Sequence, residues 1–111
     1  MTNIEIVEKY AEAWRQLNAE IISPLLHETF TYSSFWVFES LNRERYLEYL
    51  REKFKAIVSS NSVPKVSIGY DNLMNPCVVL QQGSNEPICI TVKFKDGKII
   101  EGYMIPHSML R

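Results

Sequence analysis

One glutamate has the position of a group that could do chemistry. Asp96-Gly97 is a two-residue turn signal between two alternating strands, so it fixes the register of residues 88–95 against 99–105. This register places Glu101 opposite Val92. The other members of that sheet face are Ile88, Ile90, Phe94, Ile99, Tyr103 and Ile105. A desolvated carboxyl group can serve as a general base, a general acid or a ligand anchor. The favoured alternative is a β-bulge that turns Glu101 outward, or a Tyr or Arg partner, because unpaired buried acids are rare.

The histidines and cysteines show no metal or redox pattern. His27 and His107 are far apart, and no Cys or Asp stands at ligand spacing beside either, so we expect no metal site. Cys77 and Cys89 flank the turn at 83–87, where simple hairpin pairing sets their Cα atoms beyond the ~7 Å limit for a disulfide. We therefore expect two small core residues. We also expect no cofactor, because the sequence has no Gly-rich phosphate loop, nucleophile elbow or HExxH motif.

Composition argues against several classes of partner. The chain has 111 residues, with 12 Lys and Arg against 13 Asp and Glu, and a formal net charge of -1. Without a basic block, we expect neither nucleic-acid binding nor a membrane-surface helix. No apolar run approaches the ~18 residues of a membrane span, and the N-terminus lacks a signal pattern. We expect a full-length, cytoplasmic protein with reduced cysteines and a single domain, residues 1–111.

The elements that position these residues begin with an amphipathic helix over 3–17, and a shorter helix is expected near 19–27. Residues 29–39 alternate as a strand, in which Phe35–Phe38 is apolar on both faces. Asn42 is a predicted N-cap for a long helix that ends near Ser59. Further strands are expected at 64–70, 77–82, 88–95 and 99–105. Early helices followed by an antiparallel meander predict an α+β fold.

Several short segments in this order resemble a known family. They are Lys9-Tyr10 with Ala11, Ala13 and Trp14; Leu25-Leu26-His27-Glu28 before Phe30-Thr31-Tyr32; the capped helix Asn42–Leu50; and the hairpin Lys95–Ile99. Their order is similar to that of the nuclear transport factor 2-like (NTF2-like) superfamily, which includes SnoaL-like polyketide cyclases and ketosteroid isomerase. The resemblance covers nearly the whole chain. It implies a cystatin-like α+β cone, with three N-terminal helices, one after the first strand, packed on a curved antiparallel sheet. It also implies an apolar pocket at the cone's open end.

The resemblance to the steroid isomerases of this family extends to one catalytic position of three. Those enzymes use a first-helix tyrosine and two aspartates. Tyr10 matches the tyrosine, whereas the aspartate positions fall at about Ser34 and near Ile90 or Thr91, which carry no carboxylate. The resemblance therefore implies the fold without implying isomerase activity.

We predict a domain that binds an apolar or aromatic small molecule. Its expected lining residues are Tyr10, Trp14, Tyr32, Ser34, Trp36, Ile90, Glu101 and Tyr103. One alternative is a SnoaL-like enzyme, an isomerase, cyclase or dehydratase. In that case Glu101 would be the general base and Tyr10 would donate a hydrogen bond to a developing oxyanion.

The third possibility is a homodimeric association module whose cone is filled by its own side chains. The family frequently forms homodimers through the sheet, and we expect one here. Phe35, Val37, Ile100 and Met104 would otherwise expose apolar area on the convex side of the sheet. A wet cavity with an acid and a donor converging on one point would favour the enzyme, and a filled cone would favour the module.

Overall fold

The computed structural model describes residues 1–111, apart from the side chains of Val37 and Phe38. Helix α1 (Asn3–Gln16) is followed by two 3-10 turns, η1 (Ala19–Ile21) and η2 (Ser23–Leu25). Strands β1 (Leu26–Ser34) and β2 (Val37–Asn42) precede the long helix α2 (Arg43–Ser60). The remaining elements are β3 (Lys65–Tyr70), β4 (Pro76–Gln81), β5 (Ile88–Lys95), β6 (Lys98–Pro106) and a last 3-10 turn, η3 (His107–Met109).

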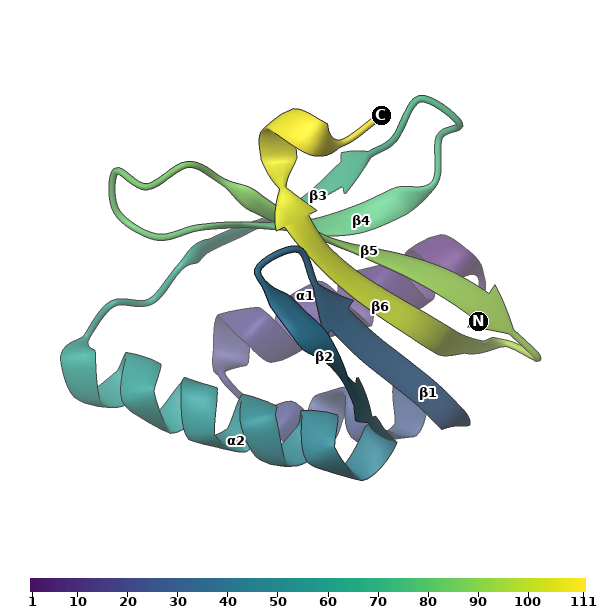
Figure 1. Ribbon diagram of the computed structural model, residues 1–111, viewed down its shortest axis with the longest axis horizontal. Helices are drawn as coiled ribbons and strands as arrows, with labels where there is room; N and C mark the ends of the chain where they lie inside the picture. Colours follow the sequence, from purple (N-terminus) through teal and green to yellow (C-terminus); the bar gives the residue numbers. More distant parts are fainter.

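The six strands form one twisted, curved sheet in the order β2-β1-β6-β5-β4-β3. All neighbours are antiparallel except β1 and β6, which run parallel. Helix α1 packs behind the sheet against β3 and β4, and α2 crosses its lower end against β1 and β2 (Figure 1). The predicted α+β class, with helices packed on a curved sheet, is confirmed. No helix in the described part of the chain is long and apolar enough to cross a membrane.

Local signals set the ends of both α-helices. Thr2 caps α1, because its side chain accepts a hydrogen bond from the Glu5 backbone N–H while Glu5 Oε1 accepts one from the Thr2 N–H. Asn42 caps α2 by accepting from the Arg45 N–H at 2.9 Å. Each helix ends at a left-handed residue, Leu17 and Asn61 respectively. The predicted helices at 3–17 and from Asn42 to about Ser59 are therefore confirmed.

Two expected elements take a different form. The helix expected near 19–27 is a pair of 3-10 turns, and β1 already begins at Leu26. The single strand expected over 29–39 is a hairpin that reverses at Phe35–Trp36. The Phe35 N–H donates to the Met104 carbonyl at 2.8 Å and the Trp36 N–H donates to Ser34 Oγ at 3.2 Å. The expected faces of Val37 and Phe38 lie outside the described residues.

The sheet buries side chains on both faces. The main core fills the space between the concave face and the helices, and it includes Trp14, Tyr10, Tyr46 and Phe30. A smaller cluster on the outer face contains Cys77, Cys89 and Ile105, packed against Val79 and Leu110. Cys89 pairs with Val79, one residue from the expected position, and both cysteines are free and buried. The interpretation of the cysteines as small core residues is confirmed.

Candidate functional site

A β-bulge decides where Glu101 points. The pairs Lys95–Lys98 and Phe94–Ile99 follow the predicted register, but then Lys93, and not Val92, lies opposite Glu101. Because one extra residue in a strand moves every later side chain to the other face, the simple register is wrong beyond Phe94, and the favoured alternative, a β-bulge that turns Glu101 outward, is confirmed. The Glu101 side chain is 51% exposed, and its Oε2 lies 3.3 Å from Lys93 Nζ.

The bulge also places the residues that follow Glu101 on the opposite face of the sheet from the predicted one. Gly102 faces inward, where a Cβ at its position would lie 3.4 to 3.5 Å from ring carbons of Phe30 and Tyr32. Tyr103 is exposed on the outer face, and Met104, which we expected outside, is buried in the main core. Since Tyr10 is fully buried in that core, Tyr10 and Glu101 lie on opposite sides of the sheet. They cannot converge on one substrate as the enzyme hypothesis requires.

Three buried tyrosines occupy the interior where the sequence predicts a pocket, and Tyr49 lies at their surface edge. The hydroxyls of Tyr10 and Tyr46 are in hydrogen-bond contact, and both residues are fully buried. The Tyr32 ring stacks on Tyr46 with centroids 4.5 Å apart, and Tyr49 lies 6.3 Å from Tyr46 toward the surface. Burial raises the pKa of all four phenols. This part of the cone is therefore filled by neutral phenols of the protein itself.

The other predicted lining residues are dispersed. Ile90 is fully buried in the main core. Ser34 accepts the Trp36 N–H at the β1–β2 turn, and Trp36 is 53% exposed in edge contact with Phe35. The structure thus brings Tyr10 and Tyr32 together, while Ser34, Trp36 and Tyr103 lie elsewhere. Tyr46, which joins the two, stands on the apolar stripe of the long helix, but nothing in the sequence indicates its hydroxyl partner.

Trp14 forms part of a separate cavity of about 120 Å³. Its wall combines apolar side chains from both layers of the fold with polar ones from α2 and the β4–β5 turn: Trp14, Lys53, Pro64, Leu80, Gln82, Asn85, Glu86 and Ile88. Leu80 and Ile88 are directly paired across β4 and β5. The Gln82 amide nitrogen donates to the Ser62 carbonyl at 2.7 Å, which holds the β4–β5 turn against the segment after α2.

The indole of Trp14 carries a polar group without a protein partner. The residue is 1% exposed, and its ring packs edge-on against Phe54 with centroids 4.9 Å apart. Among the side chains that the structure describes, its Nε1 is the one buried nitrogen or oxygen for which no hydrogen-bond partner is found. Buried donors are almost always satisfied, so such a group calls for an acceptor that the chain does not supply.

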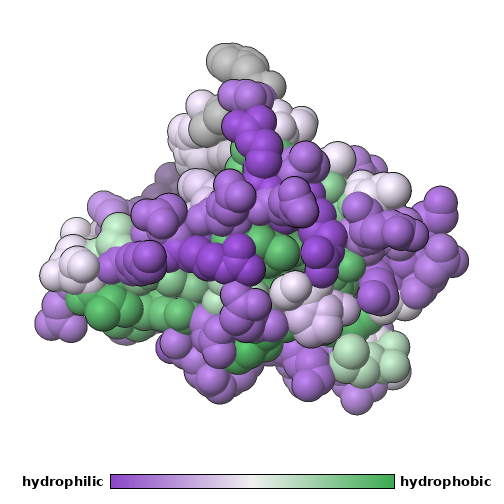
Figure 2. Space-filling view, turned by 90° about the horizontal axis from the view of Figure 1, so that it is seen from below, coloured by the Kyte–Doolittle hydropathy of each residue, from purple (hydrophilic) through white to green (hydrophobic). Residues whose placement is uncertain are grey.

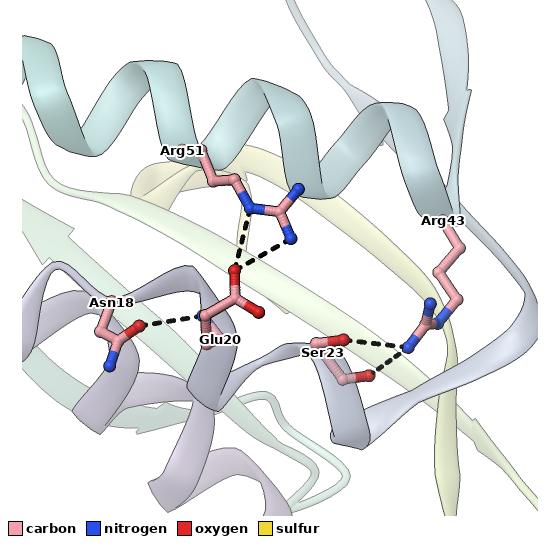
Figure 3. A network of polar contacts seen from close by, with 5 residues as sticks. All are labelled: Asn18, Glu20, Ser23, Arg43 and Arg51. Atoms are coloured by element: carbon pink, nitrogen blue, oxygen red, sulfur yellow. Dashed lines mark hydrogen bonds and ion pairs between the residues drawn. The ribbon is translucent and has the colours of Figure 1, made fainter.

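Polar contacts fix α2 relative to the turns that follow α1 (Figure 3). Arg51 forms an ion pair with the Glu20 carboxylate, in which Nε and Nη2 each lie 2.9 Å from Oε1. The Asn18 side chain accepts a hydrogen bond from the Glu20 N–H. Arg43 Nη2 donates to the carbonyl and hydroxyl of Ser23. These contacts join α2, which carries Lys53, to the turns that follow α1, which carries Trp14.

The same side of the molecule has a larger and more open groove of about 770 Å³. Figure 2, which views the molecule from the side of α2, shows apolar side chains exposed among charged ones. The apolar floor includes Leu17, Phe54 and Val58, and the rim carries both acids and bases. No group of three or more potential metal ligands is found among the described residues.

Comparisons with known proteins reveal similarity in fold alone. No protein-family model and no curated protein matches the sequence. A SnoaL-like protein of unknown function from Burkholderia thailandensis is 14% identical with a TM-score of 0.72, and the alignment covers 94% of this chain and 93% of that one. An uncharacterized cystatin-fold protein from Novosphingobium aromaticivorans is 12% identical (TM-score 0.69, covering 95% and 98%). An NTF2-like protein of unknown function from Cytophaga hutchinsonii is 15% identical (TM-score 0.68, covering 96% and 90%).

These similarities define the class of the fold. The chain has the cystatin-like α+β architecture of NTF2-like and SnoaL-like proteins, as the order of its sequence segments indicates. At this level of identity the fold carries no assignment of ligand or reaction.

Proposed function

We propose that this protein binds a small molecule with an apolar body in the Trp14 cavity. The observation that carries this proposal is the buried indole N–H of Trp14, which has no acceptor among the described residues. Nε1 exposes less than 1 Å², so a ligand oxygen would accept this hydrogen bond once a lining side chain shifts, while Leu80, Ile88 and Pro64 would contact the apolar body. This is the composition of small-molecule sites, in which apolar walls carry a few polar groups.

The size of the cavity limits the ligand. A dry cavity of about 150 Å³ in another protein holds benzene. A cavity of about 120 Å³ therefore suits a molecule of about six non-hydrogen atoms. Ligands of that size have dissociation constants of roughly 10 µM to 1 mM.

Nuclear magnetic resonance of the indole groups tests the proposal. The chain has two tryptophans, so a ¹⁵N-labelled sample gives two indole N–H signals, and Trp14→Phe identifies which one belongs to Trp14. Titration with isobutyramide, which has an oxygen acceptor on a branched apolar body, should move the Trp14 signal and leave that of Trp36 in place. Leu80→Phe, which fills the cavity, should remove the response. An unmoved Trp14 signal at 50 mM isobutyramide in the wild type would refute binding at this site.

A second candidate function, the association of two copies, is favoured by exposed aromatic side chains at one end of the sheet. Phe35 and Trp36 form the β1–β2 turn, whose Phe35 N–H is bonded to β6 beside the exposed Tyr103. Aromatic residues of this kind are enriched in interfaces. We propose a homodimer through the outer face of the sheet. Its basis differs from the sequence argument, because Met104 is buried and Ile100 is only half-exposed.

Sedimentation at micromolar concentration tests the dimer. The wild type should have the mass of two chains, and Phe35→Glu should have the mass of one. Leu73→Glu, at a residue that is 78% exposed in the β3–β4 turn, is the control and should remain dimeric. A wild-type protein that stays monomeric at 100 µM would contradict the proposal.

A further inference from the structure

We propose that the ligand of the Trp14 cavity is a small monocarboxylate and that Lys53 is its charge partner. This inference rests on the proposed binding of a small molecule in that cavity and adds the chemical class of the ligand. Lys53 and Trp14 come from different helices and line the same cavity. Lys53 supplies a cation, and Trp14 supplies a buried hydrogen-bond donor that has no acceptor among the described residues.

Lys53 differs from the other basic residues of α2 in its contacts. Arg43 donates to the carbonyl and hydroxyl of Ser23, and the others pair with carboxylates: Arg45 with Glu39, Arg51 with Glu20 and Lys55 with Glu52. For Lys53, no carboxylate lies within 4.0 Å among the residues that the structure describes, although its side chain is only half-exposed. An ammonium group without a carboxylate partner can bind an anion, and at this position the adjoining cavity offers space for one.

A carboxylate matches both polar groups at once. One of its oxygens would accept from the Lys53 ammonium group, and the other would accept from the Trp14 indole N–H once a lining side chain shifts to expose Nε1. Hydrogen bonds to an ionised acceptor are about twice as strong as neutral ones. The apolar body would then lie against Leu80 and Ile88. With about six non-hydrogen atoms, the acids that fit are short or singly branched, such as isobutyrate.

Glu86 allows a second test of the charge of the ligand. It lines the cavity and is exposed, so it forms an acidic edge to the site. Its charge opposes an anionic ligand and would favour a cationic one. Glu86→Gln should therefore strengthen carboxylate binding by about two- to fivefold in dilute buffer, an effect of one screened charge.

Isobutyrate and isobutyramide separate the class of ligand from the existence of the site, because they have the same shape and differ in charge. Ligand-observed magnetic resonance and the Trp14 indole signal would be measured at pH 7 and constant ionic strength. The wild type should bind isobutyrate about tenfold or more tightly than isobutyramide. Lys53→Met keeps the apolar stem and should reduce isobutyrate to the level of isobutyramide. Lys55→Met, whose side chain is 78% exposed on the same helix, should leave the preference intact.

The possible failures are distinguishable. If the amide binds as tightly as the carboxylate, or if the preference survives Lys53→Met, the carboxylate assignment is overturned while the site remains. If neither molecule moves the Trp14 signal, the proposed binding function itself fails. A circular dichroism spectrum of each variant shows whether the protein remains folded.

Discussion

The hydroxyl pair of Tyr10 and Tyr46 offers a quantitative test of how the interior is held. Both side chains are fully buried, and each hydroxyl has the other as its hydrogen-bond partner. Tyr10→Phe removes one hydroxyl and leaves the other buried without a partner, which costs about 1–3 kcal/mol in the free energy of unfolding. Tyr46→Phe should cost about the same, because the arrangement is reciprocal.

The double variant should be more stable than the sum of the two single changes predicts. Replacing both hydroxyls removes the bond but leaves no orphaned group, so its total cost should be about 0.5–1.5 kcal/mol. The two sites should therefore show a coupling energy of at least about 0.5 kcal/mol. With an unfolding entropy of about 2.1 cal/mol/K per residue over 111 residues, each kcal/mol lowers the melting temperature by about 4 °C.

Urea unfolding of the wild type, both single variants and the double variant measures this coupling. Tyr70→Phe is the matched control, since Tyr70 is an exposed residue of β3, and it should change stability by less than about 0.5 kcal/mol. If the single effects add to the double effect within error, the two hydroxyls do not interact and the reasoning is refuted.

Three other predictions concern the buried phenols, Glu101 and the cysteines. Buried phenols keep a raised pKa in the folded state, whereas unfolded tyrosine ionises near pH ~10, so their contribution to stability is full below about pH 10 and is lost as the pH rises. The free energy of unfolding measured with urea should thus fall from pH 9 to pH 11, by up to about 1.4 kcal/mol per pH unit for each phenol; an unchanged value would contradict the burial. Glu101→Gln should alter unfolding by less than about 0.5 kcal/mol at pH 7, because its partner Lys93 is 77% exposed; a larger change would restore the buried-acid hypothesis. Thiol reagents should label neither cysteine quickly in the folded protein; Cys77 should react first, because a hydrogen bond from Cys89 lowers its pKa and raises that of Cys89. Mass spectrometry of the labelled protein would show the reverse order if this interpretation is wrong.

The sequence alone determined the elements that depend on residues only a few positions apart, such as helix caps and tight turns. Asn42 predicts the start of α2, because an N-cap needs only its own side chain and a backbone N–H three residues away. Asp96 and Gly97 predict the last hairpin, and both adopt the positive φ that a tight turn of this kind requires. The order of these elements predicts the α+β class, and the resemblance to NTF2-like proteins implies the cone.

Only the tertiary structure decided which side chains meet. The bulge after Ile99 carries no local signal, yet it turns Glu101 outward and brings Met104 into the core. The reversal at Phe35–Trp36 has no Gly or Pro to indicate it, and its hydrogen bond to Met104 comes from a distant strand. The register determines which face of a strand is buried, so the free energy of each register depends on every residue of the strand.

The candidate site around Trp14 was likewise decided by the tertiary structure. The unsatisfied N–H of Trp14 becomes a feature only once α1, α2, β4, β5 and their connecting turn enclose it. In the sequence, Trp14 is one member of an amphipathic stripe, and Lys53 is one of several cations on a helix. Their chemistry arises because the packing removes water from one and sets the other beside the same cavity, and desolvation is a property of the folded chain and not of any segment.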